Sequence, residues 1–251
     1  MEATTLTQLH RALRQGRVVV CEGAASTILG PDPEPQSLTE LHRRYVMAGA
    51  RMLTACTFAV ADPAHILHTV QAARTVVQDT DGCIVTALAG GLRGADAVAQ
   101  LRTLAASGAD AILYETVYDC NLADEILSEA AIEIPLMLSA TFTDSLTLPS
   151  GESAADFAAL AKRHKAIAAG ANCGDSMDAT LRGAEMLRGA VPMLIVRPSA
   201  GIPDSHGRYP LDPQQWADAL STLRGVIAGG CCGTTPEHIA AFVRTLNRKT
   251  S

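Results

Sequence analysis

Residues 96–139 read DAVAQLRTLAASGADAILYETVYDCNLADEILSEAAIEIPLMLS and contain the pattern that decides the fold. Two short, mostly apolar runs occupy Ala111–Glu115 and Leu136–Ser139. Each run follows a longer stretch with apolar residues at helical spacing, Asp96–Ser107 and Leu122–Ala131. Nearly continuous apolar runs are typical of parallel strands that are covered on both faces. The stretch therefore predicts two consecutive helix–strand units of a parallel sheet.

The same alternation continues along the whole chain. Strand-like runs are Val18–Cys21, Met52–Phe58, Ile84–Leu88, Ala111–Glu115, Leu136–Ser139, Ala166–Ala169, Met193–Val196 and Gly225–Ala228. The helical stretches that follow them are Leu38–Gly49, Ala64–Val77, Asp96–Ser107, Leu122–Ala131, Ser153–His164, Met177–Leu187, Pro213–Leu223 and Pro236–Leu246. Eight such units in 251 residues, without a linker, predict a single (β/α)₈ barrel domain over residues 1–251. A doubly wound open sheet is the alternative, but no Gly-x-Gly-x-x-Gly follows the first strand.

Several local signals mark the ends of these elements. Asp62 and Asp212 each precede a proline, which is typical of a capped helix start. The longest irregular stretches, Gly30–Gln36, Ala140–Glu152 and Arg197–Leu211, follow strand ends. In a barrel of this kind, the loops after the strands form the catalytic face.

Composition excludes several classes of function. The formal net charge is −6 and no Lys/Arg cluster resembles a nucleic-acid footprint, so nucleic-acid binding is not expected. No apolar run approaches the roughly 18 residues of a membrane span. Met1–Arg17 has the pattern of a short polar helix rather than a signal peptide, so we expect a cytoplasmic location. Seven cysteines without a secretion signal favour thiol or metal chemistry over a disulfide framework.

Three cysteines fall at predicted strand ends. Cys173 closes the segment after the sixth strand, and Cys231 and Cys232 follow the eighth strand within a glycine-rich loop. Three thiolates suit Zn²⁺ and leave a fourth tetrahedral position open, as in catalytic sites. Such a centre could bind a substrate thiol as the thiolate at neutral pH. The alternative is that these are ordinary buried cysteines.

The segment around this pair resembles a known family. Gly229-Gly230-Cys231-Cys232-Gly233-Thr234-Thr235-Pro236-Glu237-His238-Ile239 is similar to the C-terminal signature of homocysteine S-methyltransferases. Ala171-Asn172-Cys173-Gly174 resembles the first zinc-ligand motif of that family. Weaker similarities are Pro198-Ser199-Ala200-Gly201-Ile202-Pro203 to its Pro-Asn-Ala-Gly segment, His42-Arg43-Arg44-Tyr45 to its second helix and Tyr114-Glu115-Thr116 to its fourth strand.

The resemblance implies a (β/α)₈ barrel that transfers a methyl group to homocysteine and releases methionine. It implies that Cys173, Cys231 and Cys232 bind zinc. It also implies that Glu115 binds the ammonium group of homocysteine, although a glutamate near a helix start is an alternative explanation. The substrate-binding set implied by the resemblance is completed by Glu22, Gly23, Asn172 and Ser199.

The chain departs from the family pattern in the first two strands. Glu22 stands where the family usually has Asp, and Cys56 stands where Asn is usual. Another thiol or selenol is therefore an alternative acceptor, and a non-catalytic zinc-binding barrel that acts as an interaction protein is an alternative function. We expect Cys21 and Cys56 to be core or pocket-wall residues. Asp204 and His206, in the seventh loop, are further candidates for contact with the substrate.

The methyl donor is not specified by these motifs. Scaffolds of this family occur with S-methylmethionine, S-adenosylmethionine, betaine or a methylated corrinoid protein. The few aromatic residues, 4% of the chain, argue against a cage for betaine. We therefore expect either a small onium compound or a separate methyl-corrinoid protein as the partner that supplies the methyl group.

Overall fold

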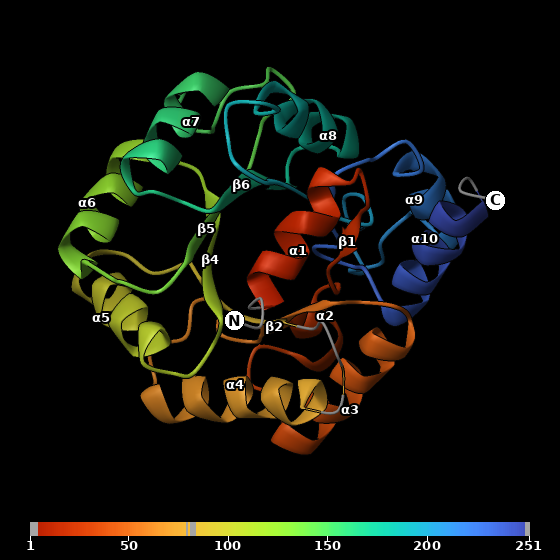
Figure 1. The fold of residues 1–251 in the computed structure, drawn as a ribbon, viewed down its shortest axis with the longest axis horizontal. Helices are drawn as coiled ribbons and strands as arrows, with labels where there is room; N and C mark the ends of the chain where they lie inside the picture. The colour runs from red at the N-terminus through yellow and green to blue at the C-terminus, as the bar shows by residue number, and fades with distance from the viewer. Residues whose placement is uncertain (1–4, 79, 81–83, 249–251) are drawn as a thin grey trace.

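The computed structural model describes residues 5–78, 80 and 84–248, which form a ring of parallel strands surrounded by helices (Figure 1). The strands are β1 (Val19–Val20), β2 (Met52–Ala55), β3 (Ile84–Ala89), β4 (Ala111–Val117), β5 (Leu136–Ala140), β6 (Ala168–Cys173), β7 (Leu194–Pro198) and β8 (Val226–Ala228). Their order in the sheet is β1-β8-β7-β6-β5-β4-β3-β2, and all of these pairs are parallel.

The ring closes between β1 and β2. Cys21 and Met52 form a parallel bridge, and the backbone N–H of Arg51 donates to the Val20 carbonyl at 2.7 Å. The N–H of Glu22 donates to the Met52 carbonyl at 3.0 Å. These bonds join the two outer members of the sheet order, so the predicted (β/α)₈ barrel is confirmed.

Helices alternate with the strands as the sequence predicts. They are α1 (Thr5–Arg14), α2 (Ala25–Leu29), α3 (Pro35–Met47), α4 (Pro63–Val77), α5 (Gly94–Ala105), α6 (Cys120–Ala130), α7 (Ala154–Arg163), α8 (Met177–Met186), α9 (Pro213–Ala219) and α10 (Pro236–Arg248). The side chains of Asp62 and Asp212 cap α4 and α9, which confirms both predicted helix starts. The short α2 was not predicted. In the N-terminal region, residues 1–4 of the expected helix lie outside the described residues.

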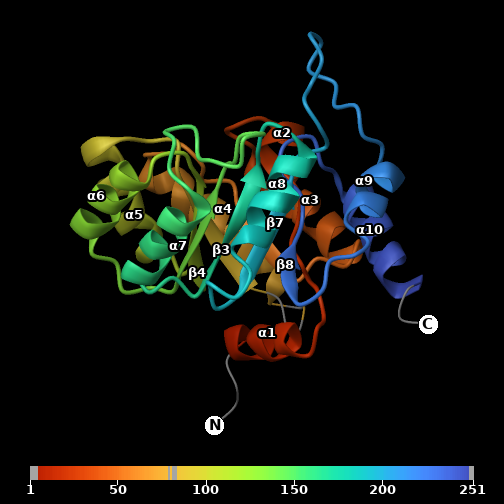
Figure 2. The ribbon, with the colours of Figure 1, turned by 90° about the horizontal axis from the view of Figure 1, so that it is seen from above.

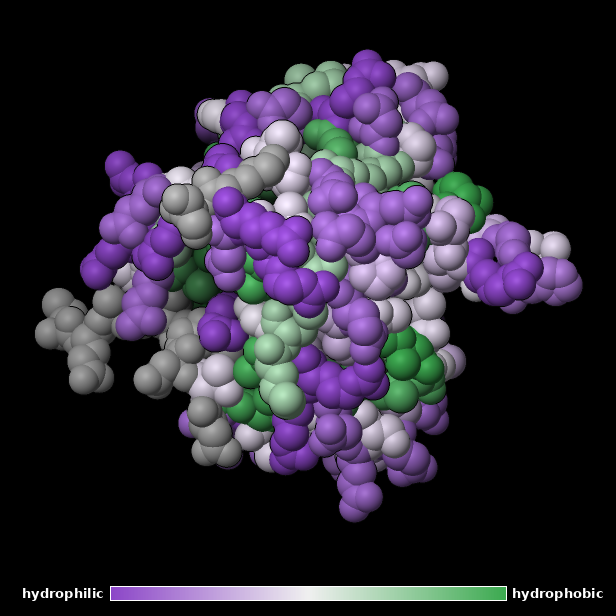
Figure 3. Space-filling model, turned by 90° about the vertical axis from the view of Figure 1, so that its right-hand side faces the viewer, coloured by the Kyte–Doolittle hydropathy of each residue, from purple (hydrophilic) through white to green (hydrophobic). Residues whose placement is uncertain are grey.

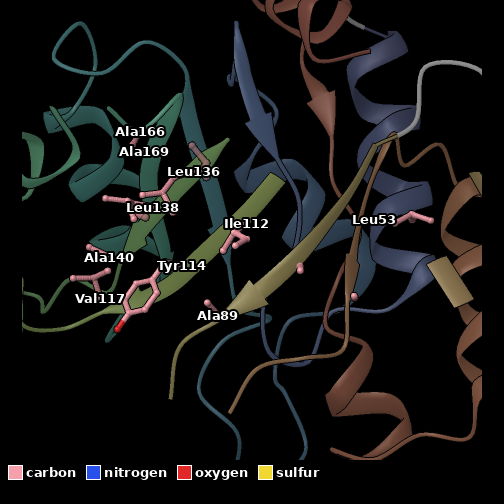
Figure 4. Packing of buried hydrophobic residues seen from close by; sticks show 14 of the residues in the cluster. Leu53, Ala89, Ile112, Tyr114, Val117, Leu136, Leu138, Ala140, Ala166 and Ala169 are labelled. Atoms are coloured by element: carbon pink, nitrogen blue, oxygen red, sulfur yellow. The ribbon is translucent and has the colours of Figure 1, made fainter. Parts of the chain in front are cut away.

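Two apolar layers hold the barrel together. Alternate strand residues point outward against the helices, as Ile112, Tyr114, Leu136 and Leu138 do in Figure 4. The other strand residues fill the barrel interior, where Met52, Ile84, Met137, Ile195 and Ile227 are buried together with Leu9 and Leu13 of α1. Helix α1 lies across the N-terminal end of the barrel and closes it (Figures 1 and 2). The opposite end, where the strands finish, is left for a site.

The largest projection from the barrel is the segment between β7 and α9. It rises from the end opposite α1 (Figure 2) and is a mostly hydrophilic protrusion at the right of Figure 3. Residues 202–208 at its tip are all exposed. The segment begins beside the cysteine pair, since the N–H of Ala200 donates to the Cys232 carbonyl at 2.9 Å.

Two strands, β6 and β2, differ most from the sequence prediction, and the other strands differ by one or two residues at an end. Strand β6 runs from Ala168 to Cys173 rather than from Ala166 to Ala169. The part that was not predicted begins with Gly170, where an added Cβ would lie 1.9 Å from the Ile195 carbonyl oxygen, so a bulky apolar residue cannot mark the strand there. Strand β2 ends at Ala55 instead of Phe58.

Among the residues that the structure describes, no helix has the length and the apolar character that a membrane span requires.

Candidate functional site

Three thiols converge at the C-terminal mouth of the barrel. Cys173 is the last residue of β6, and Cys231 and Cys232 follow β8. The Cys173 sulfur lies 2.9 Å from that of Cys231 and 3.6 Å from that of Cys232. All three sulfurs lie within 4.8 Å of one another. Tetrahedral metal–sulfur bonds of about 2.3 Å would separate sulfurs by about 3.8 Å. The cluster therefore fits a single metal ion with small side-chain adjustments.

The backbone that carries these thiols is held from both sides. The N–H of Cys231 donates to the Pro198 carbonyl at 3.0 Å, which fixes the loop after β8 against the end of β7. Cys173 has a positive φ of 53°, a conformation that costs a non-glycine residue free energy. The Thr180 hydroxyl donates to the Cys173 carbonyl and holds this turn. The strained turn aims the Cys173 sulfur at the other two.

Contacts between the three sulfurs shift the pKa values of the thiols in opposite directions. Hydrogen bonds from the Cys173 and Cys231 thiols lower the pKa of Cys232. The contacts with Cys173 and Cys232, together with burial, raise the pKa of Cys231. A metal ion would displace the thiol protons when it binds.

A cavity of about 430 Å³ lies directly beside the thiols. Its wall contains all three cysteines, Gly23 and Glu115, which are five of the eight residues that the sequence singles out as metal or substrate ligands. Residues that the sequence did not assign to the substrate also line it, including Thr54, Phe58, Thr116 and Arg197. The cavity is the only described one that the three sulfurs line. It is therefore the candidate substrate pocket.

Asn172 lies behind the cysteines and is fully buried. Its Oδ1 accepts from the Thr116 N–H at 3.1 Å and from the Ser139 hydroxyl at 2.7 Å. Its Nδ2 donates to the Thr116 hydroxyl at 2.8 Å and to the Cys231 sulfur at 3.9 Å. The amide thus links β4, β5 and the loop after β8. Its observed contacts are with the protein, and it does not line the cavity.

Glu115 forms a buried ion pair with Arg197 inside the cavity wall. Arg197 Nη1 donates to Glu115 Oε1 at 2.6 Å, and Arg197 Nε donates to the Gly230 carbonyl at 3.1 Å. Burial raises the pKa of Glu115, and the guanidinium of Arg197 opposes this effect. The sequence predicted Glu115 but missed Arg197, which it placed only at the start of a loop. Arg197 directly follows the apolar run Met193–Val196, and a charged residue at the carboxyl end of a barrel strand is the signal that could have identified it.

Glu22 is fully buried and does not line the cavity. Its Oε1 accepts from the Thr54 N–H at 3.0 Å and the Thr54 hydroxyl at 2.7 Å. Its Oε2 lies 2.9 Å from His42 Nδ1. Both carboxylate oxygens therefore have protein partners. Ser199 is also buried outside the cavity wall, at the turn after β7.

The remaining candidate residues lie in three different places: the cavity wall, the barrel interior and the protein surface. Cys56 lines the cavity, and burial raises its pKa to about 11. Cys21 lies in the barrel interior, and burial raises its pKa to about 12. Asp204 and His206 lie at the exposed tip of the segment between β7 and α9 and do not line the cavity.

Comparison of the sequence with known protein families identifies the family of this chain. A sequence model described as homocysteine S-methyltransferase matches residues 97–246, which include Glu115, Asn172 and all three clustered cysteines. This chain belongs to the homocysteine S-methyltransferase family. The match begins within α5, after the first three strands, so Glu22 and Cys56 lie outside it.

Curated relatives include homocysteine S-methyltransferases 3 and 2 from Zea mays. Each is 30% identical in an alignment 167 positions long, and the alignment covers 59% of this chain and 48% of the maize protein. The chain thus spans about half the length of the curated relatives that it matches.

Solved structures show the same barrel. The metallated form of the homocysteine methyltransferase MmuM from Escherichia coli aligns with a TM-score of 0.73 and 21% identity, over 94% of this chain and 99% of that chain. The apo form aligns with a TM-score of 0.71 and the same identity. YagE from E. coli, of the dihydrodipicolinic acid synthase family, aligns with a TM-score of 0.63 and 17% identity over 92% of this chain and 76% of that chain. Barrels of different families are thus similar to this chain, so the fold alone does not specify the chemistry.

Proposed function

We propose that the chain is a methyltransferase that moves a methyl group from an activated donor to the thiol of homocysteine and releases methionine. The observation that carries the proposal is the convergence of Cys173, Cys231 and Cys232 on the wall of one cavity at the catalytic end of the barrel. Family membership supports homocysteine as the acceptor. The maize relatives and MmuM are named for the same acceptor.

We infer that the three cysteines hold a zinc ion. Three sulfur donors suit zinc, and they leave a fourth position that faces the cavity. A bound zinc ion would lower the pKa of the acceptor thiol, so that the thiolate is available as a nucleophile near neutral pH. Asn172 would keep the Cys231 sulfur in place through its amide contacts.

The other residues of the site would orient the acceptor. Glu115 Oε2 makes no hydrogen bond with a described residue, so it can accept from the ammonium group of an amino acid. Gly23 forms part of the wall, and an added Cβ there would lie 2.6 Å from the Thr234 hydroxyl oxygen, so the close packing of the wall against Thr234 requires glycine. Glu22 and Ser199 would shape the wall from behind rather than touch the acceptor. The protein thus contributes alignment of the nucleophile with the methyl group.

The donor in this proposal is a small onium compound or a separate methyl-corrinoid protein. The group that leaves from either donor departs without needing a proton, so no general acid is required in the cavity. Glu22 favours one alternative, a different thiol or selenol as acceptor. Its carboxylate is already bound by Thr54 and His42, whereas the family pattern has an Asp that helps to hold the substrate ammonium.

The decisive experiment measures methionine formation from homocysteine by mass spectrometry with S-methylmethionine, S-adenosylmethionine, betaine and a methylated corrinoid protein as donors. The proposal expects methionine with at least one donor and loss of both zinc and activity in Cys231→Ala and Cys232→Ala. Methyl transfer that persists after the metal is lost would overturn the mechanism. Bound zinc without turnover or thiol binding would instead favour a non-catalytic interaction protein.

A further inference from the structure

The cavity contains a positive charge that the proposed chemistry does not require. Arg197 is 2% exposed and lies in the cavity wall beside Glu115 and the thiols. Among the described residues that line the cavity, it is the only lysine or arginine. Burying a guanidinium is costly unless its donors find partners. Its remaining donors therefore indicate what the pocket binds.

The contacts of Arg197 fix the group but leave part of it free. Nε donates to the Gly230 carbonyl, next to Cys231, and Nη1 donates to Glu115 Oε1. Nη2 makes no hydrogen bond with any described residue. Because the first two contacts lock the guanidinium plane, Nη2 is a preoriented donor of a residue that lines the same cavity as the thiols. A carboxylate is a group that pairs strongly with such a donor.

The ion pair with Arg197 weakens the attraction of Glu115 for a substrate ammonium, because the Glu115 carboxylate already has a cationic partner. Glu22 offers no further anion to the cavity, since it is buried behind the wall with both oxygens bonded. A substrate carboxylate, in contrast, would meet only Arg197 as a positive partner.

We propose that Arg197 binds the carboxylate of the methyl acceptor, so that the pocket selects thiols that carry a carboxylate more strictly than thiols that carry an ammonium. This inference rests on the proposed function and names a specificity-determining residue within it. The acceptors that it predicts are ω-mercapto carboxylates, of which homocysteine is one.

Two analogues of homocysteine separate the contributions. 4-Mercaptobutanoate lacks the ammonium, and 3-aminopropane-1-thiol lacks the carboxylate. Dissociation constants would be measured by calorimetry on the zinc-loaded protein without a donor, so that binding is read independently of turnover. We expect 4-mercaptobutanoate to bind within about tenfold of homocysteine and 3-aminopropane-1-thiol to bind at least about tenfold more weakly than 4-mercaptobutanoate.

Variants then assign the effect to one side chain. Arg197→Gln should weaken homocysteine and 4-mercaptobutanoate by about tenfold or more and leave 3-aminopropane-1-thiol almost unchanged. The double variant Glu115→Gln, Arg197→Gln removes both members of the ion pair, so it leaves no unpaired buried charge if the single variant folds poorly. The double variant should also lose the preference for thiols that carry a carboxylate. Arg208 is an exposed arginine of the segment between β7 and α9. Arg208→Gln is the matched control and should bind all three thiols as the wild type does.

Equal affinity of the wild type for the two analogues would overturn the inference and leave the proposed thiol chemistry intact. Equal weakening of both analogues by Arg197→Gln would do the same. If the wild type binds none of the three thiols, the proposed function fails and this inference fails with it.

Discussion

Asn172 shows how one buried side chain can support the cluster of thiols from behind. Its amide uses both its acceptor oxygen and its donor nitrogen, with partners on β4, on β5 and at Cys231. An aspartate of the same shape has no N–H, so it could not donate to the Thr116 hydroxyl or to the Cys231 sulfur as the Asn172 amide does. The residue type is therefore set by the donors and acceptors around it.

Asn172→Ala should lower both stability and metal affinity. Loss of these buried hydrogen bonds should reduce the free energy of unfolding by about 1–3 kcal/mol, measured by urea denaturation. Loss of support for Cys231 should weaken zinc binding by about tenfold or more, measured by competition with a chromophoric chelator. Ser139→Ala removes only one of the contacts and should have a smaller effect on both quantities. An Asn172→Ala variant with wild-type zinc affinity would show that the amide does not support the site.

A carboxylate in the middle of α6 joins that helix to the C-terminal end of α7. Asp124 of α6 accepts from His164 Nε2 at 2.6 Å and from Arg163, where α7 ends. The hydrogen bond from His164, and next those with Arg163, hold the pKa of Asp124 below its ordinary value. The ionised carboxylate therefore stabilises the packing of these two helices.

Stability should depend on pH through this group. The unfolded pKa of Asp is about 3.9, and the folded pKa lies below it, so the contribution is fully present above about pH 4 and is lost as pH falls through the folded pKa. Asp124→Asn should lower the melting temperature at pH 7, and it should flatten the loss of stability between about pH 4 and pH 2. Thermal unfolding across this range is the measurement. Glu125→Gln changes a neighbouring exposed carboxylate and should leave both features unchanged.

The sequence predicts well those elements that are marked by a local feature, such as an apolar run or a capping side chain. Continuous apolar runs identify all eight strands, and Asp62 and Asp212 mark two helix starts because their side chains cap the first turn. The part of β6 after Ala169 was missed because the close contact with Ile195 requires glycine at position 170, and a glycine gives no apolar signal in the sequence. The ion pair of Glu115 and Arg197 was missed because its members are 82 residues apart. Only the closed barrel brings them together.

At the scale of the whole molecule, the two ends of the barrel have different tasks. Helix α1 covers the N-terminal end, and its Leu13 is buried with the residues that fill the barrel. The thiols and the cavity lie at the other end. In barrels of this type, one end serves stability and the other carries chemistry.

Leu13→Ala should therefore separate stability from binding. Removal of this buried side chain should cost about 2–5 kcal/mol of the free energy of unfolding, measured in urea. Zinc content and homocysteine affinity of the folded variant should stay at wild-type values. Gln8→Ala, an exposed position on the same helix, is the control for changes in α1 itself. A loss of homocysteine affinity in Leu13→Ala would mean that the two ends are coupled.

Metal binding should stabilise the whole barrel, because the three thiols join β6 to the loop after β8. Zinc at about a hundredfold excess over its dissociation constant should add about 2.7 kcal/mol to the stability of the folded state, seen as a rise in melting temperature. Removal of zinc with a chelator should reverse the rise. In Cys232→Ser the rise should be much smaller, and an equal rise in that variant would place the metal elsewhere.

The closure of the barrel floor by α1 has a kinetic consequence. A pocket with a packed floor has one entrance, so two reactants that meet inside it must arrive and depart through the same opening. In the proposed reaction, a thiol held at the cysteines would therefore enter before the donor, and the spent donor would leave before the methylated product. The expected order of binding and release is then sequential, with the first reactant to bind giving the last product to leave.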